Sequence, residues 1–284
     1  MLLSIKRIDS ITEIMQKRAN LKIRLSAIFL ASTVGLLSTA QIAFSQQASL
    51  RIAAAADLQP VLPPILDQFR QSTGIAVEAT YQASAALTSQ ILNGAPFDLF
   101  LSADLGYPKR LIDAGVADTA GSPDSSSPVT YARGTLVLWT RKDSHWPNPS
   151  LATLNDPSLK RLAIANPDRA PYGRAAIATL TSVKLIDNLK PKLVTAENIS
   201  QAAQFAETGN ADAGLISLTS ARTEHLTSVG NYFVIPRDLY PPIQQGAVII
   251  TNSPNRQNAH KFLDFLLSHE TQQELAKSGL TPVN

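Results

Sequence analysis

The sequence predicts an α/β protein of two lobes, each a mixed, mainly parallel sheet flanked by helices. Short β-like runs alternate with helical runs through most of the 284 residues, an order typical of sheets covered on both faces. Two Pro-containing connections, 121–128 and 237–242, bracket about 110 residues with an α/β pattern of their own. We therefore expect one lobe from 48–135 plus 240–284 and another from 136–239, with the chain crossing between them twice.

Residues 1–45 are predicted to be a cleaved secretory signal peptide. Arg18, Lys22 and Arg24 precede the apolar run "LSAIFLASTVGLLSTA", and small residues at 43 and 45 suit a signal peptidase. A membrane anchor is the alternative, but the run is short for a span and contains Ser, Thr and Gly. Met15 lies just upstream of the basic residues, so translation starts at either Met1 or Met15.

Removing the signal peptide changes the charge balance. Residues 1–45 hold six of the 25 Lys and Arg and two of the 22 Asp and Glu, which leaves 19 bases and 20 acids, a net charge of −1. The basic balance of the whole chain therefore reflects targeting and gives no support to nucleic-acid binding. The absence of Cys excludes a lipidated Cys at the cleavage site, and four scattered His residues do not form a structural metal site.

The elements of the first lobe follow a strand–helix order. Strands are expected at 50–57, 75–81 and 97–104, and helices at 65–74, 85–94 and 107–115. Proline at positions 60, 63 and 64 predicts an irregular turn first and a regular helix only from about Pro63.

The second lobe and the return to the first show the same alternation. Strands are expected at 135–141, 161–167, 212–217 and 244–252, and helices at 173–186, 199–209 and 259–279. In open α/β sheets, ligands bind beyond the carboxyl ends of the strands, where helix N-termini point. Two such junctions in each lobe would face one cleft.

The four junctions present Asp57, Ser84, Tyr172 and Ile199. Helix N-termini carry free N–H groups and a partial positive charge, so several together bind an anion without Lys or Arg. Each residue also has a plain structural interpretation: Ser84 as a helix N-cap, Tyr172 as a packed loop aromatic, Ile199 as core, and Asp57 as an N-cap turned inward. Their equivalent placement favours a site for an oxyanion that only accepts hydrogen bonds.

Several segments then resemble a known family. "AAAADL", "YQASAALTSQILNGAPFDLFLSAD", "AIANPDRAPYGRAAIATL", "AENISQAA" and "ADAGLIS" are similar, in order and spacing, to the periplasmic molybdate-binding proteins of ABC importers. The resemblance covers nearly all of the chain after the signal peptide. It implies a two-lobed solute-binding protein of type II that closes on molybdate or tungstate in the periplasm and delivers it, as a monomer, to an inner-membrane permease, with no cofactor and no catalysis.

The resemblance also implies roles for single residues. Ser84 matches a ligand Ser, Ile199 a position that contributes its backbone N–H, and Asp57 a position that is Ser or Asn in many members. Tyr172 matches a position that is Ala in some members and a ligand Tyr in others. Ser217 stands where the former supply a Tyr, so the hydroxyl is expected to come from Tyr172 instead. No direct metal ligand is expected, because molybdenum would be held through its oxygens.

Two alternatives stay open. A site on the same fold could bind sulfate, phosphate or an organic acid: Asp57 could accept from a protonated phosphate, and Arg169 and Arg174 could clamp a carboxylate. An exported serine hydrolase with Ser84 as nucleophile is less well supported, because Ser84 lies outside a G-x-S-x-G motif and no His lies at a junction. The sequence does not separate molybdate from tungstate.

Overall fold

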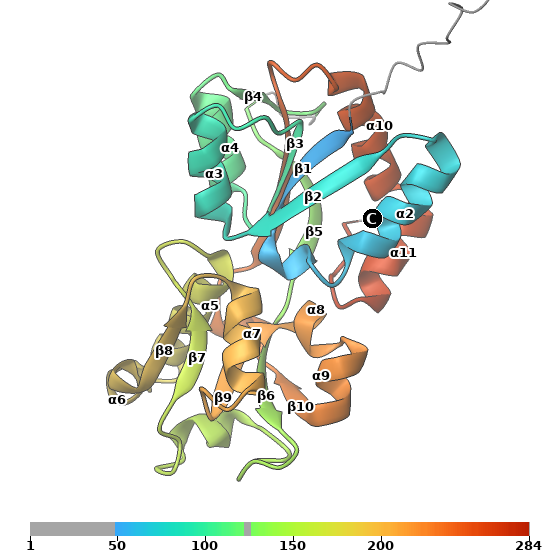
Figure 1. Ribbon diagram of the computed structural model, residues 1–284. Helices are drawn as coiled ribbons and strands as arrows, with labels where there is room; N and C mark the ends of the chain where they lie inside the picture. Colours follow the sequence, from blue (N-terminus) through green and yellow to red (C-terminus); the bar gives the residue numbers. More distant parts are fainter. Residues whose placement is uncertain (1–48, 122–125, 284) are drawn as a thin grey trace, which may run out of the picture. The chain divides into compact units, whose positions relative to one another are not determined.

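The computed structural model describes residues 49–121 and 126–283 (Figure 1). The predicted signal peptide lies outside these residues. Within them, no helix combines the length and the apolar character that crossing a bilayer requires.

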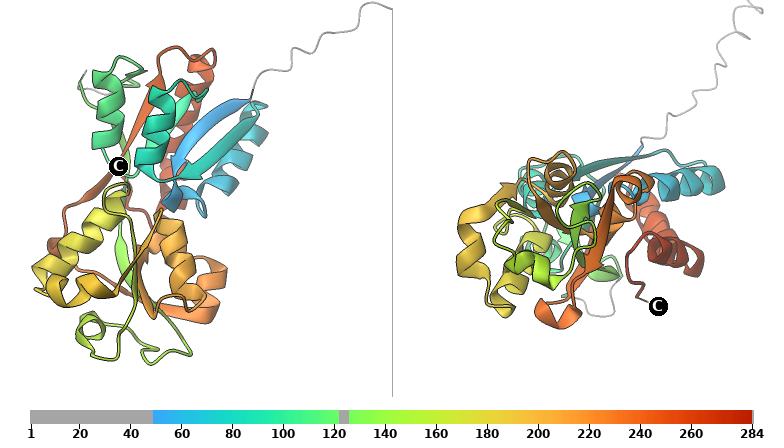
Figure 2. Two further views of the ribbon diagram at one scale, coloured as in Figure 1. Left: turned by 60° about the vertical axis from the view of Figure 1, so that its left-hand side comes forward. Right: turned by 90° about the horizontal axis from the view of Figure 1, so that it is seen from below.

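Two mixed β-sheets form the framework (Figures 1 and 2). The first has the order β2-β1-β3-β11-β4, with β5 paired to β11. Its strands are β1 (Leu50–Ala55), β2 (Val77–Gln82), β3 (Leu99–Ser102), β4 (Ala117–Asp118), β5 (Val129–Gly134) and β11 (Ile243–Ile250). β1 runs parallel to β2 and β3, whereas β11 runs antiparallel to its three neighbours. The predicted α/β class with mixed sheets is confirmed. The first sheet is not mainly parallel as expected, since two pairings of its described strands are parallel and three are antiparallel.

The second sheet has the order β10-β6-β9-β7-β8. Its strands are β6 (Leu136–Arg141), β7 (Leu162–Ala165), β8 (Leu193–Ala196), β9 (Ala213–Ser217) and β10 (Gly230–Val234). β7 is parallel to β8 and β9, and β6 is antiparallel to β9 and β10. The chain passes from the first sheet to the second between Gly134 and Leu136 and returns between Val234 and Ile243.

Helices cover both faces of the first sheet (Figure 1). On one face α2 (Leu62–Thr73), α10 (Arg256–Leu267) and α11 (His269–Lys277) pack on Ile52 and Leu101, and on the other α3 (Ser84–Leu92) and α4 (Gly106–Asp113) pack on Ala53 and Phe100. Successive strand residues point to opposite faces, so these buried runs serve two cores at once.

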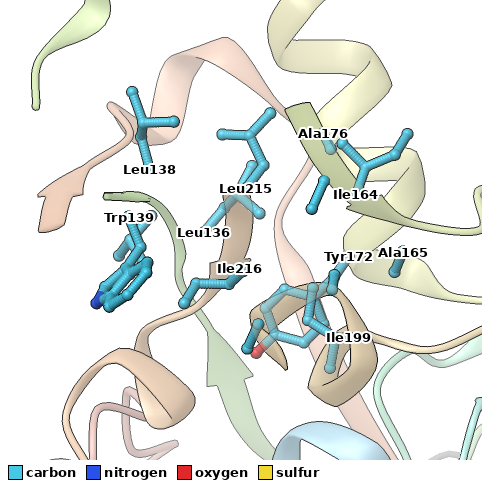
Figure 3. Close-up of a cluster of buried hydrophobic side chains, with 14 of the residues drawn as sticks. Leu136, Leu138, Trp139, Ile164, Ala165, Tyr172, Ala176, Ile199, Leu215 and Ile216 are labelled. Carbon is cyan, nitrogen blue, oxygen red and sulfur yellow. The ribbon is translucent and has the colours of Figure 1, made fainter. Parts of the chain in front are cut away.

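The second sheet is covered by five helices of the described chain: α5 (Pro171–Ser182), α6 (Ile186–Leu189), α7 (Ile199–Glu207), α8 (Leu218–Ala221) and α9 (Glu224–Val229). Trp139, Ile164 and Leu215 lie in its core, and Tyr172 and Ile199 belong to the same buried cluster (Figure 3). Two candidate site residues are therefore also core residues, which fixes their positions.

Local signals explain most element boundaries. A 3-10 helix, Ala56–Leu58, precedes α2, which starts at Leu62 with Pro in its first turn and ends at Gly74 with φ 73°. This agrees with the expected irregular turn. The C-terminal helical run is two helices and not one, because Ser268 leaves the helical region and accepts a hydrogen bond from Thr271 N at the start of α11. β4, β5, β8 and β10 were not predicted.

Candidate oxyanion-binding site

The four predicted site residues line one pocket. Its wall is made almost entirely of strand–helix junctions from both sheets: Ala55, Ala56, Asp57, Gln82, Ala83, Ser84, Ala103, Ala170, Pro171, Tyr172, Asn198 and Ile199. No Lys, Arg or His is among these residues. An anion in this pocket would meet neutral donors and a single carboxyl group.

Strand register brings the junctions together. In the first sheet Ala55 pairs with Gln82, so the 3-10 helix after β1 and helix α3 after β2 begin at the same sheet edge. In the second sheet Ala165 pairs with Ala196, which aligns the segments leading to α5 and α7. Parallel neighbours end on one side of a sheet, and this places the helix N-termini next to each other.

Ser84 is the first residue of α3 and not its N-cap, which corrects the sequence-based expectation. Ala83 occupies the N-cap position and has no side chain that could cap. The Ser84 hydroxyl instead accepts a hydrogen bond from the Ala103 N–H at 3.2 Å. A hydroxyl has one proton and two lone pairs, so Ser84 keeps its proton to donate elsewhere. With Ala83 and Ala103 beside it in the pocket wall, a ligand oxygen can approach closely.

Ile199 is the first residue of α7, and its side chain is buried at 3% exposure. The preceding Asn198 is the N-cap, with its side chain accepting a hydrogen bond from Gln201 N at 3.0 Å. First-turn N–H groups have no acceptor within their helix. Ile199 can thus contribute a backbone N–H, in keeping with the role that the sequence suggested, while its side chain packs in the core.

Asp57 lies in the middle of the 3-10 helix and does not cap it, contrary to the expectation from sequence. Ala55 is the N-cap, and the fully buried Asp57 carboxyl accepts hydrogen bonds from the Tyr172 hydroxyl at 3.0 Å and from Gln245 Nε2 at 2.5 Å. Its Oδ1 has no hydrogen-bond partner among the described residues. Burial raises the pKa of Asp57 from 3.8 to about 6, although the bonds from Gln245 and Tyr172 act to lower it.

Tyr172 comes from the first turn of α5 and is 1% exposed. Burial, and then the charge on Asp57, raises the pKa of its phenol well above 10, so it stays a neutral donor. The sequence predicted that this hydroxyl donates to the anion. In the structure its proton is directed at Asp57.

Gln245 was missed by the sequence analysis. It lies on β11, where the register against β5 shifts between Gln245 and Gly246, and its side chain is fully buried. Besides Asp57 it reaches the Tyr172 hydroxyl at 3.5 Å, whereas its own Oε1 has no partner in the described chain. Two adjacent Gln residues, Gln244 and Gln245, at the start of a strand whose remainder is apolar apart from Gly246 were the signal available in the sequence.

Ser217 stands at the position whose ligand hydroxyl was expected to come from Tyr172 instead. Its own hydroxyl forms hydrogen bonds with neighbouring residues in the chain. Ser217 is the N-cap of α8, accepts from Ser220 N at 3.2 Å, and bonds Ser220 Oγ at 2.9 Å. The Thr219 hydroxyl lies within hydrogen-bond distance of the Asp57 carbonyl, at 2.8 Å, and of Ser217 Oγ, at 2.9 Å. Ser217 is absent from the pocket lining.

The two arginines proposed as a carboxylate clamp lie outside the pocket lining. Arg169 pairs with Glu197 at 2.7 Å, and Arg174 pairs with Asp104 while lying over the Tyr107 ring. The Arg169 carbonyl accepts from Ala85 N at 3.2 Å, and Tyr107 donates to the Asp168 carbonyl at 3.2 Å. These contacts join elements of the two sheets around the pocket.

The donor set suits an oxyanion better than a metal ion or a nucleophile. No group of three His, Cys, Asp or Glu in residues 49–121 and 126–283 could hold a metal. No His lies beside Ser84 in the pocket wall, where a general base for its hydroxyl would be expected. Hydroxyls and helix N-termini around a small, buried space can instead bind a fully deprotonated anion.

Comparison with known proteins agrees with this geometry. Residues 50–281 match the family of bacterial extracellular solute-binding proteins, and the chain belongs to that family. It is 36% identical to the molybdate-binding protein ModA of Azotobacter vinelandii over 90% of this chain and 97% of that protein. ModA of Rhodobacter capsulatus is also 36% identical, over 74% of this chain and 79% of the relative.

Structural comparison points the same way. The periplasmic molybdate-binding protein of Azotobacter vinelandii superposes with a TM-score of 0.76 at 29% identity, covering 83% of this chain and all of that one.

Proposed function

We propose that this chain binds molybdate or tungstate as a tetrahedral dianion in the periplasm and delivers it to an ABC permease in the inner membrane. The anion would lie between lobe one, 48–135 plus 240–284, and lobe two, 136–239. Asp57, Ser84, Tyr172 and Ile199 would form the site. The protein would act as a monomer and catalyse no reaction.

The observation that carries the proposal is the pocket itself. Five strand–helix junctions, three from the first sheet and two from the second, line it, and its donors are hydroxyls and helix N-termini without any Lys or Arg. Such a site favours an anion that has no proton to donate. The names of the relatives support molybdate as that anion.

One observation favours a second candidate, hydrogen phosphate. This anion carries a proton, and the unpartnered Oδ1 of Asp57 is a buried acceptor in the pocket wall. An organic acid is less favoured, since Arg169 and Arg174 are paired with carboxylates away from the pocket.

A thermal-shift panel of molybdate, tungstate, sulfate, phosphate and citrate tests the proposal. A ligand at 100 times its dissociation constant stabilises a protein by about 2.7 kcal/mol, which for this size is roughly 5–10 °C in Tm. We expect that shift with molybdate and tungstate and little with the others, because longer metal–oxygen bonds fill a pocket that sulfate leaves loose. An equal shift with sulfate would reduce the proposal to a general oxyanion binder, and a shift with phosphate alone would favour the second candidate.

A further inference from the structure

Asp57 is the one carboxyl group in the wall of a pocket that we propose to bind a dianion. An ionised carboxylate only accepts hydrogen bonds and repels a negative ligand, so in that form it opposes binding. Its position is nevertheless enforced: the group is fully buried and held by Tyr172 and Gln245. The protonation state of Asp57 therefore matters for the anion.

Either group can donate the hydrogen bond between Asp57 and Tyr172, depending on the protonation state of Asp57. A separation of 3.0 Å between the carboxyl Oδ2 and the phenol oxygen suits donation from either group. When Asp57 is ionised, the single proton of Tyr172 points at it, and Tyr172 offers the pocket no donor. When Asp57 is protonated, it can donate to the phenol oxygen, which frees the Tyr172 proton for a ligand.

We propose that Asp57 sets the direction of the Tyr172 O–H, so that the site takes up one proton, at Asp57, with each oxyanion that it binds. The proton comes from the solvent and returns to it on release. This inference rests on the proposed function, whose ligand has no proton of its own to bring. It makes Asp57 a specificity-determining residue for fully deprotonated oxyanions, and it makes binding stronger as the pH falls.

Gln245 is the positioning residue of this arrangement. Its Nε2 donates to the Asp57 Oδ2 whether that oxygen carries a proton or not, so the carboxyl stays in place in both states. The Oδ1 of Asp57 lacks a partner in the described chain, and an unpartnered buried oxygen is far less costly in a neutral acid than in a carboxylate. The unpartnered Oδ1 thus weakens the preference of Asp57 for the ionised form, so a bound anion can shift the group to the protonated form.

In the parts of the chain that the structure describes, no Lys, Arg or His lines the pocket beside Asp57, so the pocket wall supplies no cation that would stabilise its charge. The titratable groups that interact with it are the phenols of Tyr172 on α5 and Tyr131 on β5. Its 3-10 helix also packs on α7, α8 and β2. The charged side chains of these elements and of α5 lie elsewhere: Glu78 is exposed on β2, Glu207 bonds His225, and Arg174 bonds Asp104. Helix α8 carries no charged residue.

Proton uptake follows from linkage between protonation and anion binding. Burial already raises the pKa of Asp57 to about 6, and a dianion in the same pocket raises it further. Between pH 6 and the pKa of the bound state, the dissociation constant should increase by up to about tenfold per pH unit. Molybdate and tungstate themselves remain deprotonated and monomeric at micromolar concentration across this range.

Calorimetric titration of the protein with molybdate from pH 6 to 8, in buffers of different ionisation enthalpy, measures the protons taken up. We expect close to one proton per anion at pH 7 and a dissociation constant that increases with pH. Asp57→Asn supplies a neutral N–H donor to Tyr172 at every pH. It should take up no proton, show a flat pH profile and bind more tightly than the parent at pH 8. Glu78→Gln, which removes an exposed carboxylate, should keep the parent's slope.

Two results would overturn the inference. One is molybdate binding by the parent without proton uptake, and the other is an Asp57→Asn variant that retains the parent's pH dependence. The number of protons that the unaltered protein takes up per anion tests the inference even if the Asp57→Asn variant does not fold. Absence of molybdate and tungstate binding at every pH would reject the proposed function as well, whereas binding without a proton would reject this inference alone.

Discussion

Gly134 controls whether Tyr172 can hold its position, and Gly134→Ala tests this. A Cβ atom at Gly134 would lie 2.2 Å from the Tyr172 hydroxyl oxygen and 2.8 Å from Cζ. Tyr172 has no room to withdraw, because α5 starts in tight contact with β7: a Cβ at Gly173 would lie 2.2 Å from the Ala165 carbonyl oxygen. The substitution must therefore displace the Tyr172 ring or the strand.

The expected changes in stability and in molybdate affinity follow from these contacts. Overpacking a buried site costs about 1–3 kcal/mol. In a protein of this size that lowers Tm by roughly 2–12 °C. Displacing the hydroxyl also removes a hydrogen bond to a charged ligand, worth about 1.5–3 kcal/mol, so molybdate affinity should fall about tenfold to a hundredfold. Apo melting and calorimetric titration measure the two effects separately.

Two controls sharpen the test. Gly106→Ala, at the start of α4, places a methyl group 3.7 Å from Asp104 Oδ2, an ordinary van der Waals contact, so stability and affinity should be kept. Combining Gly134→Ala with Tyr172→Phe removes the oxygen with the shortest contact, so the double variant should be more stable than the two single effects added together. Parent-like melting and affinity in Gly134→Ala, or strict additivity in the double variant, would refute the reasoning.

Three further outcomes are expected. Ser84→Ala should weaken molybdate binding about tenfold to a hundredfold and lower the free energy of unfolding by about 1–3 kcal/mol, because the buried Ala103 N–H loses its acceptor; titration and urea unfolding check both. Ser217→Ala should lower the free energy of unfolding by about 1 kcal/mol through the lost helix cap and leave molybdate affinity nearly unchanged. If Tyr172→Phe kept the affinity and Ser217→Ala abolished binding, the ligand hydroxyl would have to be assigned to Ser217 instead of Tyr172. Burial raises the pKa of Asp57 from 3.8 to about 6, so the contribution of this group to the free energy of unfolding is present below pH 4 and is lost as the pH rises through 6. Relative to Asp57→Asn, the free energy of unfolding of the apo parent, measured with urea, should therefore fall by up to about 3 kcal/mol between pH 4 and 7. A difference between the two proteins that does not change with pH would contradict the pKa shift.

Much of the fold could be predicted because its signals are local. The alternation of apolar runs with helical periodicity identified most strands and helices, and Pro63 and Gly74 marked the limits of α2 closely. The general rule that ligands lie at strand–helix junctions then selected Asp57, Ser84, Tyr172 and Ile199, all of which line one pocket. Short strands such as β8, with half-exposed residues, gave no comparable pattern.

The tertiary structure alone decided how these residues are used. Ser84 was expected to cap its helix, but packing of α3 against the end of β3 turns its hydroxyl toward Ala103. Gln245, 188 positions from Asp57 in the chain, becomes a hydrogen-bond partner only because β11 inserts between β3 and β5 with an irregular register. Local periodicity determines which elements form and where their ends lie. The partners of a buried polar group depend on which distant elements packing brings to it, and no short-range pattern in a single sequence encodes that.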